Sequence, residues 1–453
     1  MILESASLTL IGFIALIGFL LLFIAKFKWH VFFAMLLPLV AFALIPGVNL
    51  NNFIDAFESG FGKTLSGIAI VIVLGSIMAE ALKHTGAIEV ITKSMVKLVG
   101  KKRMPLALTL SGFILGVAVF SDIAFVILNP LVHSAAAVMG VSMSSMSTGL
   151  VVALQLTHAV VPPTPGPLAA AAIVGADIGK VIIFGALVTL VGALGGWIWG
   201  QFIVGPKIDA PPSEEYIGKS FIDGNIDAED DSQPSTLKSY LPIIVPVVLI
   251  ALQSVFKFTL PEENILNSIF GFLGWPVVAL GIGVLLSYSN ITKDEHKEAA
   301  KNDWVEEGLR TSAMILVVTG LGGSLSQVLR GTPAVTAVTD FVASAGLPAI
   351  LLPFIIGVLG NTITGSTTVG AITSASLLAP MLPSLGLSPE VAVLAGGSGA
   401  IIIKYVNSSY FWVCTSLTKM DLKDALISYG GGTLIGGILS FLATWVLWGV
   451  GLI

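Results

Sequence analysis

Polar side chains occur at four places inside otherwise apolar segments, and each place offers groups that can bind a small solute or an ion. The first is the string VFSDIAF, which contains Ser121 and Asp122. An ionisable side chain at membrane depth is costly and faces a cavity or a partner. As a carboxylate, Asp122 could take up a proton or coordinate Na⁺, which favours a role in ion coupling or substrate binding. A structural hydrogen bond is the alternative.

The second place is the string GNTITGSTTVG, which carries no charge but is dense in hydroxyl and amide groups. Its candidate substrate-binding residues are Asn361, Thr362, Thr364, Gly365, Ser366, Thr367 and Thr368. Short helices that end at a glycine-rich tip can direct backbone N–H groups and the positive end of the helix dipole toward an anion. The pattern therefore favours contact with a solute, with close helix packing as the alternative.

The third place is the string THAVVPPTPGP, in which four prolines interrupt a long apolar segment. Proline removes a backbone donor and clashes with the preceding turn, so the helix must break there. Freed backbone groups are tolerated at membrane depth only where protein or a polar cavity receives them. The candidate substrate-binding residues are Thr157, His158, Pro163, Thr164 and Gly166. His158 could also relay protons; a packing histidine at a simple proline kink is the alternative.

The fourth place is the string IIIKYVNSSYFW, where Asn407, Ser408 and Ser409 interrupt another apolar helix. Lys404 is the only basic residue that the hydropathy pattern places deep in the membrane, and it could pair with Asp122 or with a substrate carboxylate. Extension of its side chain to the inner surface is the alternative. Hydroxyls, amides, one cation and helix ends, with few aromatics, suit a small, hydrophilic, negatively charged solute.

The composition defines the class of protein that must position these groups. Hydrophobic residues make up 55% of the chain and charged residues 11%, with a mean hydropathy of +0.96. Repeated apolar runs of about 20 residues indicate a polytopic helical membrane protein surrounded by lipid. The net charge of −5 comes without any basic patch that would bind nucleic acid. An enzyme embedded in the membrane would need a metal cluster or a nucleophile–base pair, and His133, His158 and Cys414 do not form one by their spacing. We therefore expect no enzymatic activity and no metal; a channel is a weaker alternative.

Ten segments are apolar and long enough to cross a bilayer as helices. They cover residues 8–25, 31–46, 64–82, 145–172, 180–204, 239–257, 269–288, 309–329, 391–413 and 425–449. Two further apolar stretches, 104–139 and 348–382, are each about 36 residues long, whereas two full crossings and a turn need about 40. They favour re-entrant hairpins, with full crossings as the alternative. The expected fold class is an all-α membrane protein with about 10 transmembrane helices plus two re-entrant hairpins.

The two halves of the chain resemble each other. Matching pairs recur 247 residues later: Lys63-Thr64, Leu74-Gly75 and Leu82-Lys83 return as Arg310-Thr311, Leu321-Gly322 and Leu329-Arg330. Five crossings separate the two starts, and an odd number inverts the second copy, a common plan of secondary transporters. Chance similarity between apolar segments is the alternative. When the N-terminus lies outside, most Lys and Arg fall on the inner face, so both termini are expected outside.

These observations predict an order of units along the chain. Scaffold helices occupy residues 1–60, a first inverted repeat 61–204, a cytoplasmic linker 205–238, connecting scaffold helices 239–307 and a second inverted repeat 308–453. Each repeat contains one hairpin and one broken helix, at 104–139 and 145–172 in the first and at 348–382 and 391–413 in the second. The four polar places are expected to meet at the membrane midplane.

The chain resembles the gluconate permease (gluconate:H⁺ symporter) family of the ion-transporter superfamily, over nearly its whole length after about Gly60. The similar strings are GFGKTLSGIAIVIVLGSIMAE, FSDIAFVILNPL, THAVVPPTPGPLAAAAIVGADIGK, GSTTVG and YVNSSYFW. The resemblance implies proton-coupled uptake of sugar acids or of related hydroxy and amino acids. It also implies an elevator-type transporter, in which a mobile domain carries the hairpins and the scaffold forms a homodimer.

The chain departs from the family pattern at the candidate site. The family usually has Glu where Asp122 stands, often His where Thr164 stands, and Arg where Asn361 stands, while Lys404 has no counterpart. We therefore hypothesise that the substrate-binding cation has moved from the second hairpin to the second broken helix. The function expected is import of a small organic acid such as gluconate across the inner or plasma membrane. Protons are the expected coupling ion, through Asp122 and His158, and no other cofactor is expected. A sodium-coupled di- or tricarboxylate carrier, or another hydroxy-acid or amino-acid carrier, is the alternative.

Overall fold

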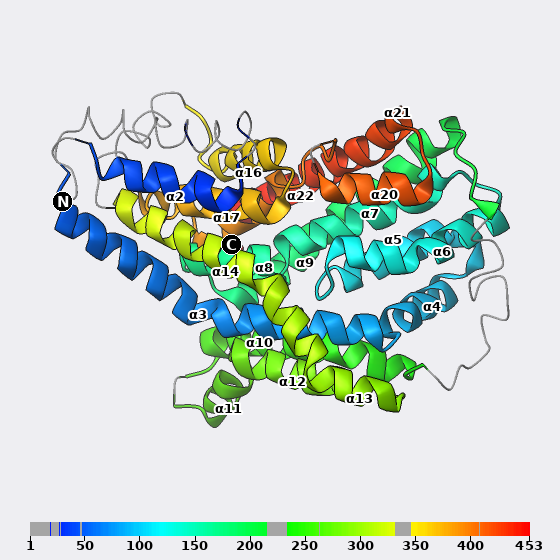
Figure 1. Cartoon of the computed structure of the whole chain (residues 1–453), viewed down its shortest axis with the longest axis horizontal. Helices are drawn as coiled ribbons and strands as arrows, with labels where there is room; N and C mark the ends of the chain where they lie inside the picture. The colour runs from blue at the N-terminus through cyan, green and yellow to red at the C-terminus, as the bar shows by residue number, and fades with distance from the viewer. Residues whose placement is uncertain are drawn as a thin grey trace.

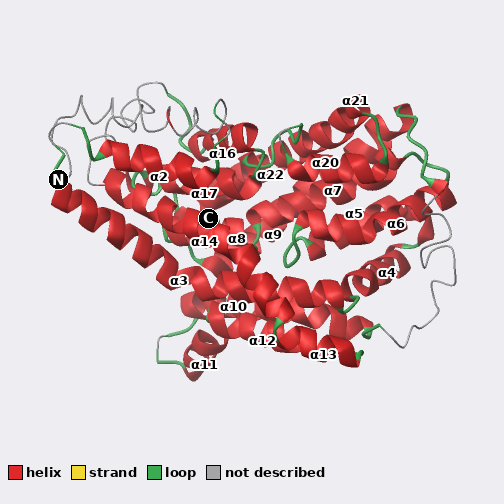
Figure 2. Ribbon diagram, viewed as in Figure 1, coloured by secondary structure: helices red, strands yellow, loops and turns green. Residues whose placement is uncertain are grey.

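The computed structural model describes residues 29–45, 48–214, 233–261, 263–330, 346–406 and 408–453, with the isolated positions 19 and 27. Within these residues all regular elements are helices and none is a strand (Figure 2). The expected all-α fold is therefore confirmed for this part of the chain. The helix expected at 8–25 and most of the linker lie outside the described residues.

Seven helical segments among the described residues are long and apolar enough to cross a membrane. They are Leu50–His84, Ser121–Met139, Met143–Val174, Ile178–Lys207, Thr236–Lys257, Asp303–Leu329 and Leu422–Gly449. An eighth results if α11 (Ile265–Leu273) and α12 (Pro276–Tyr288), bent by 59°, form one span. The expected number was ten. Three expected crossings are not among these spans: the segment 8–25 lies outside the described residues, α2 (Val31–Phe42) has only 12 residues, and the segment 391–413 is divided into two short helices. One span, Ser121–Met139, was expected as an arm of a hairpin and not as a crossing.

The longest helix, α3 (Leu50–His84), runs without interruption for 35 residues. The predicted crossing at 64–82 is thus only part of it, and the predicted boundary after residue 60 falls inside it. Figure 1 shows α3 and α14 (Asp303–Arg330) crossing beside α10 (Thr236–Thr259) and α12. Small residues allow α3 and α14 to approach closely: a Cβ added at Gly60 would lie 2.5 Å from the carbonyl oxygen of Gly323.

The candidate hairpins are formed by α5 (Met104–Leu115) with α6 (Ser121–Met139), and by α16 (Leu351–Thr364) with α17 (Thr367–Leu378). At 1.5 Å per residue, α5, α16 and α17 are about 18–21 Å long, less than the ~30 Å of a hydrocarbon core. Their lengths fit re-entrant arms. Helix α6, with 19 residues, is long enough to cross.

Both predicted helix breaks are present. Helix α7 (Met143–Val160) is entirely buried and is followed by four non-helical residues before α8 (Pro165–Val174). Thr157 and His158 still belong to the last turn of α7, so the break begins at Val161, four residues after the start of the polar string. The second break separates α19 (Pro389–Gly399) from α20 (Ser409–Thr418).

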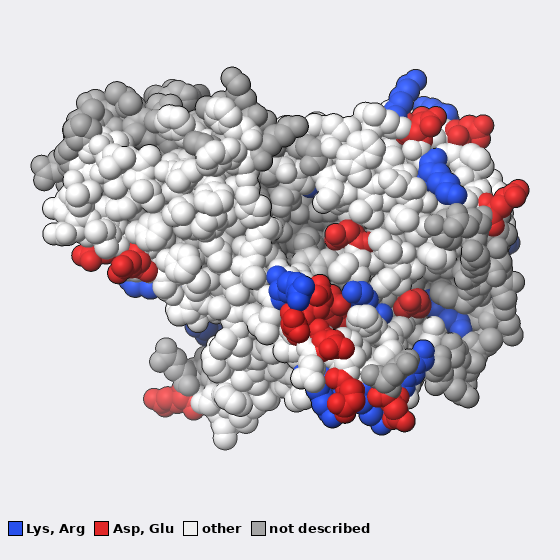
Figure 3. Space-filling view, in the orientation of Figure 1, with Lys and Arg blue, Asp and Glu red and all other residues white. Residues whose placement is uncertain are grey.

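Helix α7 packs against α5, α9 (Ile178–Ile198) and α22 (Gly431–Gly449), and all of its residues are buried (Figure 1). The view in Figure 3 shows a largely uncharged face, as expected for a surface covered by lipid. Charged side chains gather near α13 (Asp294–Lys301), a helix that the sequence interpretation did not include.

Candidate solute-binding site

Three helices begin at one cavity of about 250 Å³. Ser121 and Asp122 form the first turn of α6, Ser366 is the N-cap of α17, and Ser408 is the N-cap of α20. The first N–H groups of a helix have no partner within the helix, and the helix dipole makes this end positive. The Ser366 Oγ atom caps α17 by accepting from the Val369 N–H, whereas α6 and α20 have no side-chain cap. Helix N-termini that meet at a polar cavity are a typical arrangement for binding an anion, which makes this cavity the candidate site.

The residues that line this cavity come from both halves of the chain. They are Ser121, Asp122, Gln155, His158, Thr364, Gly365, Ser366, Thr367, Lys404, Ser408, Ser409 and Tyr410. All four polar places singled out in the sequence contribute to it. Segments more than 200 positions apart are thus brought together around one polar space.

Lys404 is the cation of the site, and its side chain is only 1% exposed. The ammonium nitrogen donates to Oδ1 of Asn361 at 2.6 Å and to the carbonyl oxygen of Gly365 at 2.9 Å. Among the ion pairs of the described residues, none includes Lys404 or Asp122. Burying a charge is costly unless it is paired, so a cation with only neutral partners favours an anion in the cavity.

Local backbone structure holds Lys404 in place. The chain between α19 and α20 is irregular, and Ile403 has a φ of 54°, which is rare for a β-branched residue. The Asn361 amide donates to the carbonyl oxygen of Ile402 at 2.9 Å, and the Tyr405 hydroxyl donates to that of Thr362 at 2.6 Å. The tip of α16 and the second break therefore support each other. Asn361 and Thr362 therefore do not line the cavity but support the residues that do.

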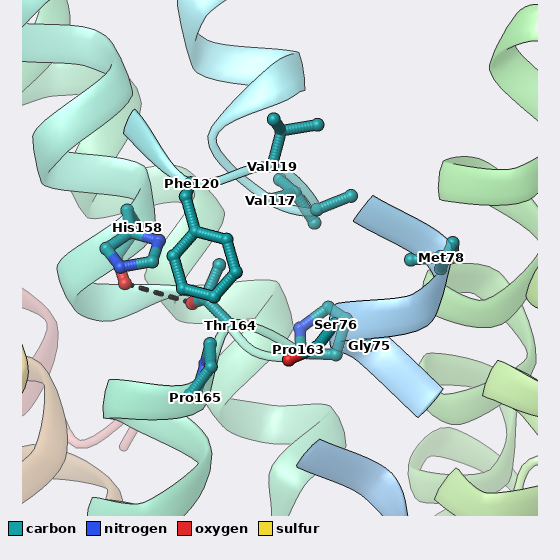
Figure 4. A pocket seen from close by; sticks show the side chains of 11 residues that line it. Gly75, Ser76, Met78, Val117, Val119, Phe120, His158, Pro163, Thr164 and Pro165 are labelled. Carbon is teal, nitrogen blue, oxygen red and sulfur yellow. Dashed lines mark hydrogen bonds between the residues drawn. The ribbon is translucent and has the colours of Figure 1, made fainter. Parts of the chain in front are cut away.

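His158 contributes to two cavities. It lines the larger one and also a small cavity of about 10 Å³, shared with Ser76 and Phe120 (Figure 4). The rings of His158 and Phe120 lie 5.5 Å apart between centroids. The Thr164 hydroxyl donates to the His158 carbonyl oxygen at 2.9 Å, which closes the turn after α7. In the described part of the chain, Nδ1 of His158 is buried without a hydrogen-bond partner.

Several predicted ligands do not reach the larger cavity. Pro163 and Thr164 line the small one, and the Thr157 hydroxyl is buried with no partner among the described residues. A Cβ added at Gly166 would lie 3.4 Å from the Cα of Thr368, so these two residues form the contact between α8 and α17. Pro163, Thr164 and Thr157 therefore belong to the packing around the first helix break, and Gly166 and Thr368 to the helix contact beside it. Asn407 lies outside the described residues.

Two cavity residues were not identified from the sequence. Gln155 lies three residues before His158 on α7, and its Nε2 atom donates to the Thr367 Oγ1 atom at 2.9 Å. Tyr410, in the first turn of α20, donates from its hydroxyl to the Val151 carbonyl oxygen at 3.2 Å. The available signal was the polar Gln155 inside a buried apolar helix, on the same face as His158.

Several apolar spans and a polar cavity at interrupted helices, in a fold whose described regular elements are all helical, are typical of a membrane transporter. A sequence profile described as "GntP family permease" matches residues 8–450. The chain therefore belongs to the GntP family of permeases, and it is a multi-pass protein of the inner membrane.

Individual proteins agree with this assignment. The chain is 30% identical to the high-affinity gluconate transporter of Escherichia coli K12, over 90% of this chain and 92% of that protein. It is 29% identical to the D-serine transporter of the same organism, over 94% of this chain and 95% of that protein. The Alcanivorax borkumensis YdaH transporter shares the fold, with a TM-score of 0.61, 17% identity and 89% of each chain covered. The family and these relatives are transporters, not enzymes.

Proposed function

We propose that the protein is a secondary active transporter that imports a small hydroxy acid, such as gluconate, together with protons. The observation that carries the proposal is Lys404, a buried cation at the wall of a polar cavity that has no acidic partner among the described residues. A carboxylate of the solute would provide the missing negative charge. The uncapped first turns of α6 and α20 would supply further N–H donors.

The size of the cavity and the relatives support this class of solute. A volume of about 250 Å³ lies just below the range of ~300–1,000 Å³ that is usual for sites of drug-sized ligands. The relatives are named for gluconate and for D-serine, two small acids that carry polar groups next to the carboxylate. Hydroxyl groups of Ser366, Ser408 and Ser409 are available at the cavity for such groups.

A charge balance supports coupling to a cation. The empty cavity contains one positive side chain, Lys404, and one carboxylate, Asp122, so an anionic solute would leave it with a net negative charge. Moving a net charge through a low-dielectric membrane is costly. One proton taken up by Asp122 makes the loaded site neutral. Asp122 is exposed, and no hydrogen bond from a described residue occupies its carboxylate, so it is free to accept the proton. His158, on the same cavity, is the second candidate for carrying it.

We propose alternating access by two inverted repeats, and the contact between α3 and α14 supports it. A Cβ added at Gly60 would lie 2.5 Å from the Gly323 carbonyl oxygen, and one added at Gly308 would lie 3.0 Å from the Ile77 backbone nitrogen. In the repeat register of 247 residues, position 323 corresponds to 76 and position 308 to 61. The contact on α14 moves from position 323 to 308 as the contact on α3 moves from 60 to 77, so the first helices of the two repeats run antiparallel, as inversion of one repeat requires.

In this proposal the two hairpins and the two broken helices form the moving unit, and α3, α10, α12 and α14 form most of the scaffold. The outside location of both termini and a homodimer formed by the scaffold are parts of the same proposal. The outside location of the termini rests on the distribution of Lys and Arg. The homodimer rests on the family resemblance.

The test is uptake of labelled gluconate by purified protein in lipid vesicles. An alkaline interior should drive accumulation, and a protonophore should abolish it. Accumulation driven only by a sodium gradient would show that Na⁺, and not the proton, is the coupling ion. A sustained current without coupling to another ion would indicate a channel. Chemical change of the recovered solute would indicate an enzyme. Failure to take up any small hydroxy acid or amino acid would overturn the proposed function.

A further inference from the structure

The side-chain amide of Gln155 has a hydrogen-bond partner for its nitrogen but none for its oxygen among the described residues. It is 4% exposed, lies on the wholly buried α7 and lines the 250 Å³ cavity. Its Nε2 atom donates to the Thr367 Oγ1 atom at 2.9 Å. Among the described residues, no donor reaches its Oε1 atom. Oε1 is not among the buried side-chain atoms that lack a partner, so it is accessible from the cavity. A solute that fills the cavity removes water from this oxygen and must provide a donor in its place, because an unpaired buried acceptor is costly.

The partner of Gln155 is itself well positioned. Thr367 is the first residue of α17, directly after the N-cap Ser366, whose Oγ accepts from the Val369 N–H at 3.3 Å. Because the amide nitrogen of Gln155 donates to Thr367 at the start of α17, the amide oxygen is the group that can accept a hydrogen bond from the solute. The contact also links α7 of the first half to the second hairpin across 212 positions of sequence.

The cavity therefore has two kinds of wall. Lys404 and the N-terminal turn of α20 offer donors, which suit a carboxylate. Asp122 and the Oε1 atom of Gln155 offer acceptors, which suit a hydroxyl or an ammonium group. A solute that satisfies both walls has a hydrogen-bond donor close to its carboxylate.

We propose that Gln155 is a specificity-determining residue that accepts a hydrogen bond from the donor group at C2 of the substrate. The transporter then selects 2-hydroxy or 2-amino acids over acids that lack this donor. A plain monocarboxylate leaves Oε1 unpaired, and a dicarboxylate places a second negative charge near Asp122. This inference rests on the proposed function, because it assumes that the cavity binds the transported acid.

The discrimination has an expected size. Leaving a buried polar group unpaired weakens binding by roughly 5- to 150-fold. An acid without the C2 donor should therefore bind at least about 5-fold more weakly than its hydroxy or amino counterpart. In Gln155→Leu, which has a similar volume but no acceptor, this ratio should fall close to one, because binding of the hydroxy acid weakens while binding of the deoxy acid does not.

The experiment measures dissociation constants of purified protein for three pairs of ligands: gluconate and 2-deoxygluconate, glycerate and 3-hydroxypropionate, and D-serine and 3-hydroxypropionate. The variants are Gln155→Leu and Thr367→Val, which removes the acceptor that orients the amide and should lower the ratio partly. Ser147→Ala is the control, since Ser147 lies on the same buried helix but bonds to Tyr429 away from the cavity. It should leave the ratio unchanged.

The outcomes separate the inference from the function on which it rests. Equal affinity of wild-type protein for both members of each pair overturns the inference and leaves the transport of acids intact. An unchanged ratio in Gln155→Leu, with both ligands weakened equally, shows a structural role and also overturns it. If Gln155→Leu does not fold, an unchanged ratio in Thr367→Val decides against it. Absence of binding to all of these acids removes the proposed function itself.

Discussion

The ammonium nitrogen of Lys404 lies 2.6 Å from the Oδ1 atom of Asn361, a residue 43 positions earlier in the chain. Asn361 stands at the place where the family resemblance implies an arginine. This contact agrees with the hypothesis that the substrate-binding cation has moved from the second hairpin to the second broken helix, because Lys404 reaches the hairpin residue that stands at that place. A cation on a broken helix can replace one on a hairpin because the two elements meet at the same cavity.

Removing this cation should remove substrate binding. We expect Lys404→Ala to weaken binding of the transported acid by about 1.5–3 kcal/mol, the usual contribution of a hydrogen bond to a charged group, or to abolish it. Lys404→Arg should weaken binding less, because the charge is kept while the contacts to Asn361 and Gly365 change. Titration calorimetry with purified protein measures both. Lys419→Ala, which removes an exposed lysine bonded to Ser213, is the control. Unchanged affinity in both Lys404 variants would end the hypothesis.

Asp122 should affect coupling more than binding. In Asp122→Asn the loaded site has no carboxylate to protonate, so a proton gradient should no longer drive accumulation. Exchange of labelled for unlabelled solute requires no net proton movement and should persist. Vesicle assays of uptake and exchange separate the two, with Asp294→Asn on the exposed α13 as the control. Accumulation that still follows the pH gradient in Asp122→Asn would assign the proton to another group, with His158 next to be tested.

The helix breaks could be predicted because their causes are local. Two adjacent prolines, Pro162 and Pro163, prevent a helix whatever surrounds them, and α7 ends at Val160. The hydroxyl-rich string around Ser366 likewise indicated a helix start, and Ser366 is the N-cap of α17. Proximity of the four polar places followed from the repeat, and all four contribute to one cavity.

The direction of individual side chains could not be predicted from the same strings. Thr157 and His158 are neighbours, but successive residues of a helix point about 100° apart, and only His158 reaches the cavity. Gln155 was missed because its role depends on Thr367, which is 212 positions away. The segment 391–413 was predicted as a crossing interrupted at residues 407–409, but its helix already ends at Gly399. The irregular backbone around Ile403 depends on contacts with α16, which the sequence does not reveal.

The carboxyl group of Glu89 should make stability depend on pH. Glu89 lies on α4 (Ala87–Val99), outside the membrane-spanning segments, and burial raises the pKa of its carboxyl above the ordinary value. The folded state then holds this proton more tightly than the unfolded state. Its contribution to stability is fully present below the ordinary pKa of Glu and is lost as the pH rises through the raised value. Glu89→Gln, which keeps the shape without the charge, should therefore raise the melting temperature at neutral pH.

Thermal unfolding in detergent between about pH 4 and pH 8 measures this effect, and wild type and Glu89→Gln should converge at the acidic end. Asp294→Asn is the matched control, because the pKa of the Asp294 carboxyl is shifted in the opposite direction. A hydrogen bond from Lys297 lowers the pKa of the Asp294 carboxyl, so this variant should not gain stability at neutral pH. A melting difference between Glu89→Gln and wild type that does not change with pH would contradict the assignment.

The close contact of α3 with α14 should tolerate no added volume. A Cβ at Gly60 would lie 2.5 Å from the Gly323 carbonyl oxygen and 2.8 Å from the Cα of Ser324, both on the facing helix. Backbone atoms cannot move aside as a flexible side chain can, so we expect Gly60→Ala to destabilise the protein by about 1–3 kcal/mol. The chain offers a matched control on the same helix: a Cβ at Gly67 meets nothing within 4 Å. Gly67→Ala should be neutral or stabilising by up to about 1 kcal/mol, because alanine favours the helix. Melting temperatures of the two variants in lipid nanodiscs test this difference. If Gly60→Ala melts like Gly67→Ala, the two helices do not touch as described, and the antiparallel contact that supports an inverted repeat is lost with them.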